Sequence, residues 1–155
     1  MERLEVVTHS PRETQRLGRH LGELAEPGDL YLLTGPLGAG KTTLIQGIAE
    51  GLGVPDPVRS PTFVLMARYR GRFPLYHLDL YRVEDLAEVL DLGLEEYLEG
   101  DGLLVVEWAD RAREVFPADH LHIALEPTGE QERRLTLRAE GERYRTLLER
   151  LRPRL

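Results

Sequence analysis

The run Gly35-Pro36-Leu37-Gly38-Ala39-Gly40-Lys41-Thr42 is the most informative part of this 155-residue sequence. It has the pattern G-x-x-x-x-G-K-T of the P-loop, in which backbone N–H groups surround phosphate. The chain contains 20 Lys and Arg residues, and Lys41 is the only lysine among them. Because an ammonium on a thin stem fits such a loop better than a planar guanidinium, this distribution indicates that Lys41 binds phosphate.

The flanking residues supply the strand and the helix that a P-loop requires. Residues 29–34 are a short apolar run with one aromatic residue, which is typical of a buried strand. Apolar residues at helical spacing follow from Thr43 to Leu52, and nearby glycines predict the end of that helix. The helix N-terminus would attract phosphate, and Thr43 would lie next to the bound nucleotide. The Thr42 hydroxyl would bind Mg²⁺. The alternative is an ordinary glycine turn before a helix.

Length and composition predict one domain over residues 1–155. No apolar run approaches the roughly 20 residues that span a bilayer, so no membrane contact is expected. The N-terminal residues lack the pattern of a signal peptide, and the chain has no cysteine, which excludes disulfides and cysteine-based metal sites. The expected location is cytoplasmic.

The net charge of −7 argues against a broad nucleic-acid-binding surface. Arginines gather at residues 68–72 and 143–154. We interpret them as solvated faces that carry Glu–Arg pairs. The alternative is a docking patch for an acidic partner or an RNA tail.

Hydrophobic periodicity predicts strands that alternate with helices. A capping box, Ser10-Pro11-Arg12-Glu13, predicts the start of the first helix. The other expected elements are a hairpin over 63–79 turning at 70–72, a mostly helical stretch over 83–97 interrupted near Gly93, a short helix over 110–116, strands at 103–106, 121–125 and 134–137, and a helix over 142–151. This order implies a P-loop NTPase-like, three-layer α/β/α fold, and its hairpins imply a mixed central sheet.

Two carboxylates end predicted strands and are candidates for the second half of a hydrolytic site. Glu107 follows four apolar residues, as expected for an acid at the edge of a central strand. Asp79 ends a strand with alternating character. Nucleotide hydrolysis needs an acid near Mg²⁺ and a group that positions water. We assign the metal to Glu107 and the water, or the metal's outer shell, to Asp79. The alternative for each is a helix cap.

Four further residues are candidates for a role at the site. Ser60 and Thr62 lie where P-loop switch proteins sense the γ-phosphate, although a simple turn is the alternative. His77 is interpreted as a hydrogen-bonded structural residue. Trp108 is interpreted as core packing, and the alternative is that it shields the nucleotide from water.

The solitary lysine also bears on the base of the nucleotide. Guanine-specific GTPases use an Asn-Lys-x-Asp motif, which cannot occur in a chain whose only lysine is Lys41. ATP is therefore the expected ligand.

Taken together, the motifs resemble one known family. Four strings stand in the order and at the distances of the TsaE (formerly YjeE) family. They are the P-loop, Ser60-Pro61-Thr62-Phe63, His77-Leu78-Asp79-Leu80-Tyr81-Arg82 and Val106-Glu107-Trp108. The similarity covers nearly the whole chain, and the second and third strings are more diagnostic than the P-loop.

The resemblance implies a role in making threonylcarbamoyladenosine at adenosine 37 of tRNAs that read ANN codons. Family members join TsaB and TsaD, and TsaD performs the transfer, so tRNA is reached through the complex. The implied activity is a Mg²⁺-dependent ATPase that is weak alone and stimulated by partners. The family pattern assigns phosphate to Lys41, Mg²⁺ to Thr42 and Glu107, and hydrolysis to Asp79. It also implies nucleotide contacts within residues 10–14 and 129–133.

Two rival functions fit a P-loop fold. A stand-alone small-molecule kinase would need an acceptor pocket and an arginine-rich lid, for which Arg68, Arg70 and Arg72 are candidates. A binding module without useful hydrolysis is the other rival. No acid or base of an acceptor site stands out in the sequence.

Overall fold

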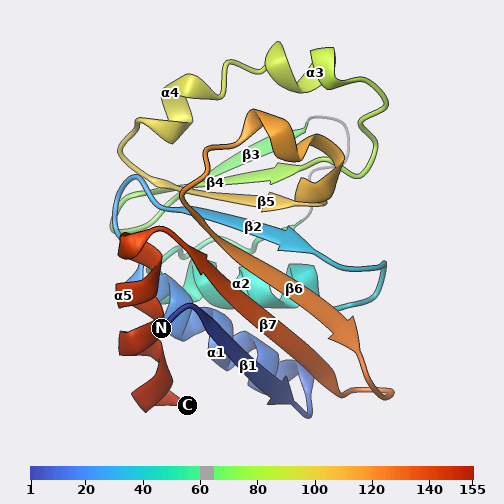
Figure 1. Cartoon of the computed structure of the whole chain (residues 1–155), viewed down its shortest axis with the longest axis vertical. Coiled ribbons are helices and arrows are strands. Elements are labelled where there is room, and N and C mark those ends of the chain that lie inside the picture. The colour runs from blue at the N-terminus through green and yellow to red at the C-terminus, as the bar shows by residue number, and fades with distance from the viewer. Residues whose placement is uncertain (60–64) are drawn as a thin grey trace.

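The computed structural model describes residues 1–59 and 65–155, which form a mixed sheet with helices on both faces (Figure 1). In chain order the elements are β1 (Arg3–Thr8), α1 (Pro11–Leu24), β2 (Leu30–Thr34), α2 (Lys41–Gly51), β3 (Met66–Arg70), β4 (Pro74–Asp79), α3 (Leu86–Leu90), α4 (Glu95–Leu98), β5 (Leu103–Glu107), the 3₁₀ segment η1 (Ala109–Val115), β6 (His120–Pro127), β7 (Arg133–Glu140), α5 (Glu142–Leu151) and the 3₁₀ turn η2 (Arg152–Arg154). In these ranges no helix has the length and apolar character that crossing a membrane requires.

The sheet has the strand order β1-β7-β6-β2-β5-β4-β3. Its centre is parallel, because β2 pairs in parallel with β5 and β6, and β4 pairs in parallel with β5. Its edges are antiparallel, because β3 pairs with β4, and β7 pairs with β6 and β1. The mixed sheet expected from the two hairpins is confirmed.

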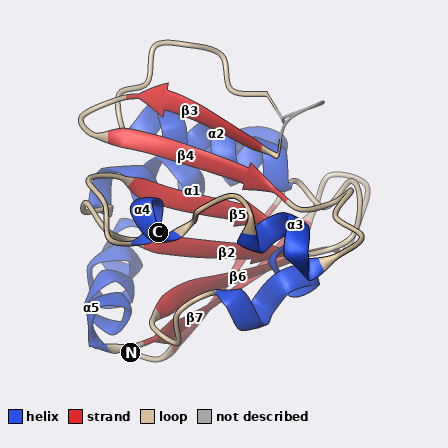
Figure 2. Ribbon diagram, turned by 90° about the horizontal axis from the view of Figure 1, so that it is seen from above, coloured by secondary structure: helices blue, strands red, loops and turns tan. Residues whose placement is uncertain are grey.

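Two hydrophobic cores lie on opposite faces of this sheet. Along β2, Tyr31 and Leu33 pack with residues of α1, α2 and α5, whereas Leu30 and Leu32 pack with residues of α3, α4 and η1. Figure 2 shows α2 and α3 on opposite sides of the strands. Because side chains alternate along a strand, the four consecutive apolar residues of β2 are what a strand covered on both faces requires. The three-layer α/β/α architecture is therefore confirmed.

Helices α1 and α2 approach each other backbone to backbone. A Cβ atom at Gly18 would lie 2.2 Å from the Leu44 carbonyl oxygen, and one at Gly22 would lie 2.1 Å from the Ile48 oxygen. In the opposite direction, a Cβ atom at Gly47 would lie 2.0 Å, and one at Gly51 would lie 2.1 Å, from a carbonyl oxygen of α1. Glycines spaced four apart on each helix allow this contact. It fixes α2, the helix that follows the P-loop, against α1.

The capping box at the start of α1 forms in part. The Glu13 N–H donates to the Ser10 hydroxyl oxygen over 3.2 Å, as predicted, and Pro11 is the first helical residue. The Glu13 carboxylate accepts the N–H of His9 over 3.0 Å. The helix therefore starts where the sequence places it, and the return bond goes one residue further out than expected.

The mostly helical stretch expected over residues 83–97, with its interruption near Gly93, is present, but its helices are shorter than expected. The structure has only two short helices there, because Asp85 caps α3 and Gly93 adopts a φ of 68° that ends regular helix. The strand expected from Phe63 begins at Met66, and Phe63 lies outside the described residues. The helix expected over 110–116 is 3₁₀ and is kinked at Ala112.

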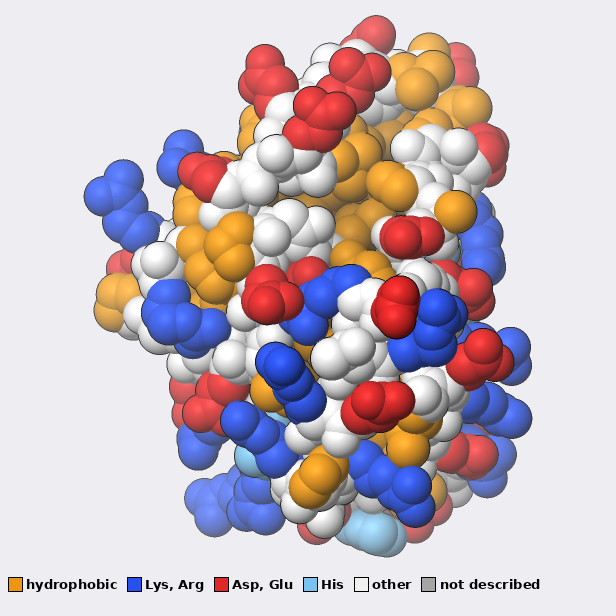
Figure 3. All heavy atoms as spheres, turned by 60° about the vertical axis from the view of Figure 1, so that its left-hand side comes forward, with side chains coloured by type: hydrophobic (Ala, Val, Ile, Leu, Met, Phe, Trp, Pro, Cys, Tyr) orange, Lys and Arg blue, Asp and Glu red, His pale blue; other side chains and the backbone are white. Residues whose placement is uncertain are grey.

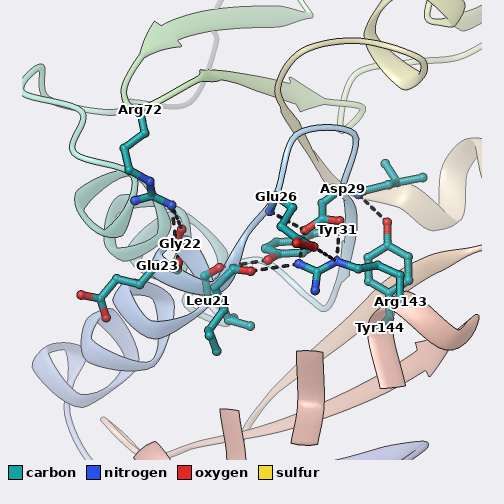
Figure 4. A network of polar contacts seen from close by, with 11 residues as sticks. Leu21, Gly22, Glu23, Glu26, Asp29, Tyr31, Arg72, Arg143 and Tyr144 are labelled. Atoms are coloured by element: carbon teal, nitrogen blue, oxygen red, sulfur yellow. Dashed lines mark hydrogen bonds and ion pairs between the residues drawn. The ribbon is translucent and has the colours of Figure 1, made fainter. Parts of the chain in front are cut away.

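A buried ion pair ties α5 to the strand that leads into the P-loop (Figure 4). The Arg143 guanidinium donates to both oxygens of Asp29 over 3.0 and 2.7 Å, and Asp29 is only 5% exposed. The next residue, Tyr144, accepts the Leu30 N–H over 2.9 Å through its hydroxyl oxygen. Together they hold the first residues of β2 in place.

Replacing Arg143 with methionine is expected to lower the free energy of unfolding by about 2–3 kcal/mol. The change keeps most of the apolar stem but leaves the Asp29 carboxylate buried without its partner; the partial exposure of Arg143 places the loss below that of a fully buried pair. Adding Asp29→Asn should recover part of the loss. Urea denaturation measures both, and Arg150→Met, at an exposed position of α5, is a control expected to stay within about 0.5 kcal/mol.

Candidate functional site

A cavity of about 500 Å³ opens at the C-terminal ends of β2, β4 and β5. Ligands of open α/β sheets bind at this edge. The residues that line it come from the P-loop and the start of α2, from the end of β4, from the end of β5, and from β7: Leu37, Gly38, Ala39, Gly40, Lys41, Thr42, Thr43, Asp79, Tyr81, Arg82, Glu107, Trp108 and Arg133. The structure thus brings together most of the sequence-predicted site residues.

Two glycines of the P-loop are required by its geometry. Gly40 precedes α2 with a φ of 97°, in the left-handed region that side chains disfavour. A Cβ atom at Gly35 would lie 2.5 Å from the Leu125 carbonyl oxygen of β6. Gly35 and Pro36 do not line the cavity themselves, but their carbonyl oxygens hold the side chain of Lys41.

The Lys41 ammonium is folded into the loop and covered by an indole. Its Nζ donates to the carbonyl oxygens of Gly35 and Pro36, the latter over 3.1 Å, and lies 3.6 Å from the centre of the Trp108 ring. Lys41 is 5% exposed. Burial lowers its pKa, and the nearby Glu107 carboxylate opposes that shift. The free protein thus holds a desolvated cation at the floor of the cavity.

Glu107 ends β5 at the cavity wall and is 3% exposed. Its Oε2 is 2.6 Å from Nε2 of His77, a fully buried residue of β4. The expectation that His77 is hydrogen-bonded is confirmed. The helix-cap alternative for Glu107 has no support, because its carboxylate bonds to His77 and η1 has no side-chain cap.

Asp79 lies beside Glu107, because the two residues are register partners in the parallel pair of β4 and β5. Its Oδ1 accepts the Tyr81 N–H over 3.0 Å, and α3 is capped by Asp85 instead. Burial raises the Asp79 pKa above its ordinary value, and the Tyr81 N–H opposes that rise. The side chain is half-buried at the cavity wall, with its carboxylate disfavoured by desolvation.

Asp79→Asn is expected to stabilise the free protein by about 0.5 kcal/mol near pH 8. A carboxyl whose folded pKa is raised binds its proton more tightly when folded, so ionisation destabilises the fold above that pKa. The advantage of the variant should therefore shrink as the pH falls through the raised pKa. Urea denaturation of both proteins near pH 8 and near pH 5 tests this, and an advantage that grows on acidification would contradict it.

Trp108 covers the cavity with an unusual backbone conformation. Its φ of 58° and ψ of 39° are left-handed, and no other described residue except glycine has a positive φ. The ring lies over Lys41, and its centroid is 5.0 Å from that of Tyr81. The Arg111 guanidinium lies 5.5 Å from the indole centroid. Trp108 also packs against the core on the α3 side, as expected, and its shielding of a nucleotide from water stays a prediction.

Arg133 is a cavity residue that motif reasoning alone did not single out. Its guanidinium donates to the Gly38 carbonyl oxygen over 3.1 Å and to those of Gly129 and Glu132 over 3.1 and 2.8 Å. It thereby joins the P-loop to the β6–β7 turn. On the same side, the Thr14 methyl group lies within 3.9 Å of where a Cβ on Gly40 would stand. Only the resemblance, through residues 10–14 and 129–133, pointed to these neighbours.

The remaining sequence candidates have different outcomes. Ser60 and Thr62 fall outside the described residues. Arg68, Arg70 and Arg72 do not line the cavity. Arg72 instead donates to the carbonyl oxygens of Gly51 and Gly22, at the far ends of α2 and α1 from the P-loop (Figure 4).

The residues present fit a Mg²⁺ ion held together with phosphates. Thr42, in the first turn of α2, and Glu107 offer oxygen ligands on the cavity wall. Within residues 1–59 and 65–155, no group of three or more His, Cys, Asp or Glu side chains forms a metal cage. Mg²⁺ needs no such cage, since it binds one or two protein oxygens and completes its shell with phosphate oxygens and water.

Comparison with known proteins places the chain in a family. The family model described as threonylcarbamoyl adenosine biosynthesis protein TsaE matches residues 8–135. The chain belongs to the TsaE family. It is 45% identical over 152 residues to the tRNA threonylcarbamoyladenosine biosynthesis protein TsaE of Bacillus subtilis, covering 97% of this chain and 95% of that protein. The TsaE of Treponema pallidum is 38% identical over 134 residues, covering 86% and 99%.

A solved TsaE-like structure has the same architecture. The crystal structure of YdiB from Bacillus subtilis superposes with a TM-score of 0.85 at 39% identity, covering 99% of this chain and 96% of that one. The segment that matches the TsaE model includes Lys41, Asp79, Glu107 and Arg133. The residues that meet at the cavity thus all lie within the part shared with the family.

Proposed function

We propose that this TsaE-family chain is a Mg²⁺-dependent ATPase. It acts as a nucleotide-driven switch on TsaB-like and TsaD-like partners during threonylcarbamoyl modification of tRNA, in the cytoplasm, and does not perform the transfer itself. One observation carries this proposal: a P-loop lysine and two strand-end carboxylates, from three separate elements, meet at one cavity. The same site supports a single ATPase domain over residues 1–155.

Each residue has a distinct task in ATP hydrolysis. Lys41 would turn from the Gly35 and Pro36 carbonyls to the β- and γ-phosphates, and the P-loop N–H groups would hold the same phosphates. Thr42 and Glu107 would hold Mg²⁺, which supplies charge neutralisation when bound. Asp79 would accept a hydrogen bond from the attacking water, or from water on the metal. Attack on the γ-phosphorus breaks its bond to the ADP oxygen and yields ADP and phosphate.

The arginines at the cavity explain why hydrolysis should be slow without a partner. Among the described residues, Arg82 and Arg133 line it. Arg133 is already engaged by four backbone carbonyls, and Arg82 is exposed to solvent. A positioned arginine accelerates phosphoryl transfer by about 10³–10⁵-fold in related chemistry. A partner that orders Arg82 or adds a positive charge of its own would therefore stimulate turnover.

The charge distribution supports an indirect relation to tRNA. Eight Asp and Glu residues, and no Lys or Arg, lie between residues 84 and 101 around α3 and α4. Elsewhere arginines alternate with acids and pair with them, as in Arg19 with Glu50 and Arg154 with Glu23. Figure 3 shows acidic groups over the upper part of one face and both signs mixed below. Tight RNA binding uses a basic face, so we assign the tRNA to the partner proteins.

The test is ATP hydrolysis by the purified chain, alone and with TsaB-like and TsaD-like proteins, together with co-purification of the three. We expect slow hydrolysis that depends on Mg²⁺, and an increase when the partners are present. Neither stimulation nor a complex would contradict the switch function. Fast phosphorylation of a metabolite without partners would instead favour the small-molecule kinase.

A further inference from the structure

We propose that His77 is the positioning residue that aims the Glu107 carboxylate at the metal. This inference rests on the proposed function, since it concerns how Mg²⁺ is held. His77 does not reach the cavity itself. It would act on the nucleotide only through Glu107.

The contact between the two side chains is short and shielded from water. His77 Nε2 and Glu107 Oε2 are 2.6 Å apart, and the residues are 0% and 3% exposed. A carboxylate oxygen accepts, so the proton of this bond belongs to Nε2. Backbone pairing fixes both ends, because β4 and β5 run in parallel and the Leu80 N–H donates to the Glu107 carbonyl oxygen over 3.1 Å.

The rest of the imidazole ring has no competing polar task. Its Nδ1 is buried and has no hydrogen-bond partner among residues 1–59 and 65–155. Its register partners, Val105 on β5 and Ala67 on β3, and Leu75 two residues earlier on β4 are all apolar. An apolar side chain would fill such a position without the cost of desolvating an imidazole. The bond to Glu107 is the one polar interaction that accounts for a histidine there.

That bond restricts how Glu107 can present its oxygens. With Oε2 held by His77, Oε1 is the carboxylate oxygen without a hydrogen bond to any described residue, and Glu107 lines the cavity. A glutamate side chain otherwise has several rotamers, and ordering them costs free energy when a metal binds. Partners behind a metal ligand hold it in the binding orientation, and their loss typically weakens metal affinity about 10- to 100-fold.

Two substitutions separate this role from simple packing. His77→Gln places an amide N–H near the position of Nε2, so it can still donate to Glu107, whereas His77→Leu fills similar space without a donor. Calorimetry of ADP binding with Mg²⁺ and with a chelator gives the gain in affinity that the metal confers. Thermal unfolding of each variant reports its stability, and the Mg²⁺ concentration for half-maximal ATP hydrolysis is a second readout.

We expect His77→Leu to reduce the metal-dependent gain in ADP affinity by about 10-fold or more, with ADP binding in chelator changed less than about twofold. His77→Gln should restore most of that gain. If both variants keep the wild-type gain, His77 is only structural. The same conclusion follows if the ADP affinity measured in chelator and the ADP affinity measured in Mg²⁺ fall by the same factor. If His77→Leu does not fold, His77→Asn replaces it, because its shorter amide cannot reach Glu107.

The calorimetric readout keeps this inference separate from the proposed function. A wild-type chain whose ADP binding gains from Mg²⁺ but which hydrolyses no ATP would contradict the ATPase and leave the His77 role testable as above. A wild-type chain whose ADP binding gains nothing from Mg²⁺ would overturn the positioning role itself.

Discussion

Replacing Lys41 with arginine is expected to reduce kcat/KM for ATP hydrolysis by about 10³-fold, although the positive charge is kept. The ammonium sits between two P-loop carbonyls and the Trp108 ring, 3.6 Å from the ring centre. A planar guanidinium cannot occupy that space and then enter the ring of N–H groups around the phosphates. Phosphate release measured with saturating and limiting Mg²⁺-ATP gives the two kinetic constants.

Two comparisons make the Lys41 result interpretable. Lys41→Met, which removes the charge, should be as inactive as the arginine variant if shape and charge are both needed. Arg150→Lys, an exchange of the same two residue types at an exposed position of α5, should hydrolyse ATP at the wild-type rate. Retention of more than about a tenth of the activity by Lys41→Arg would mean that positive charge alone suffices.

The second large effect is expected for Glu107→Gln, which should lower kcat about 10²- to 10³-fold and raise the Mg²⁺ requirement. Glutamine has nearly the same shape, and its amide oxygen can still accept from His77 Nε2 at the observed position. The substitution therefore removes the carboxylate charge and little else. Hydrolysis measured across a Mg²⁺ titration shows the shift, and thermal unfolding verifies the fold.

The choice of substitution matters at this position. Glu107→Ala would also leave the buried Nε2 of His77 without its partner, at a cost of about 1–3 kcal/mol of stability. Glu88→Gln, on the exposed side of α3, is the matched control. It should change neither kcat nor the Mg²⁺ requirement. Wild-type turnover in Glu107→Gln at ordinary Mg²⁺ would remove Glu107 from the metal site.

The sequence predicted the layers of the fold and most of the cavity because local patterns determine them. The P-loop glycines, the apolar β2 and β5, and the acids that end β4 and β5 are all visible in short windows. Parallel strands then bring Asp79 and Glu107 side by side without any information beyond strand order. The metal and water roles of these two residues remain predictions that the variants above address.

What the sequence could not predict depends on distant contacts. The hydrogen bond between His77 and Glu107 spans 30 residues, and that between Arg133 and the Gly38 carbonyl oxygen spans 95. No periodicity relates such pairs. Over residues 83–97 the sequence predicts the break near the left-handed Gly93, but not that Asp85 caps α3 and delays its start to Leu86.

The glycine contact between α1 and α2 gives the cavity one wall that cannot move. Gly18 and Gly47 leave no gap between the two backbones, so α2 can neither slide nor roll without steric overlap. The opposite wall carries the Tyr81 and Trp108 rings, which are tilted against each other, and the Trp108 ring contacts the Lys41 ammonium. We therefore expect the difference between ATP and ADP to be expressed as a displacement of the aromatic wall, which makes that wall the place where a partner protein could read the nucleotide.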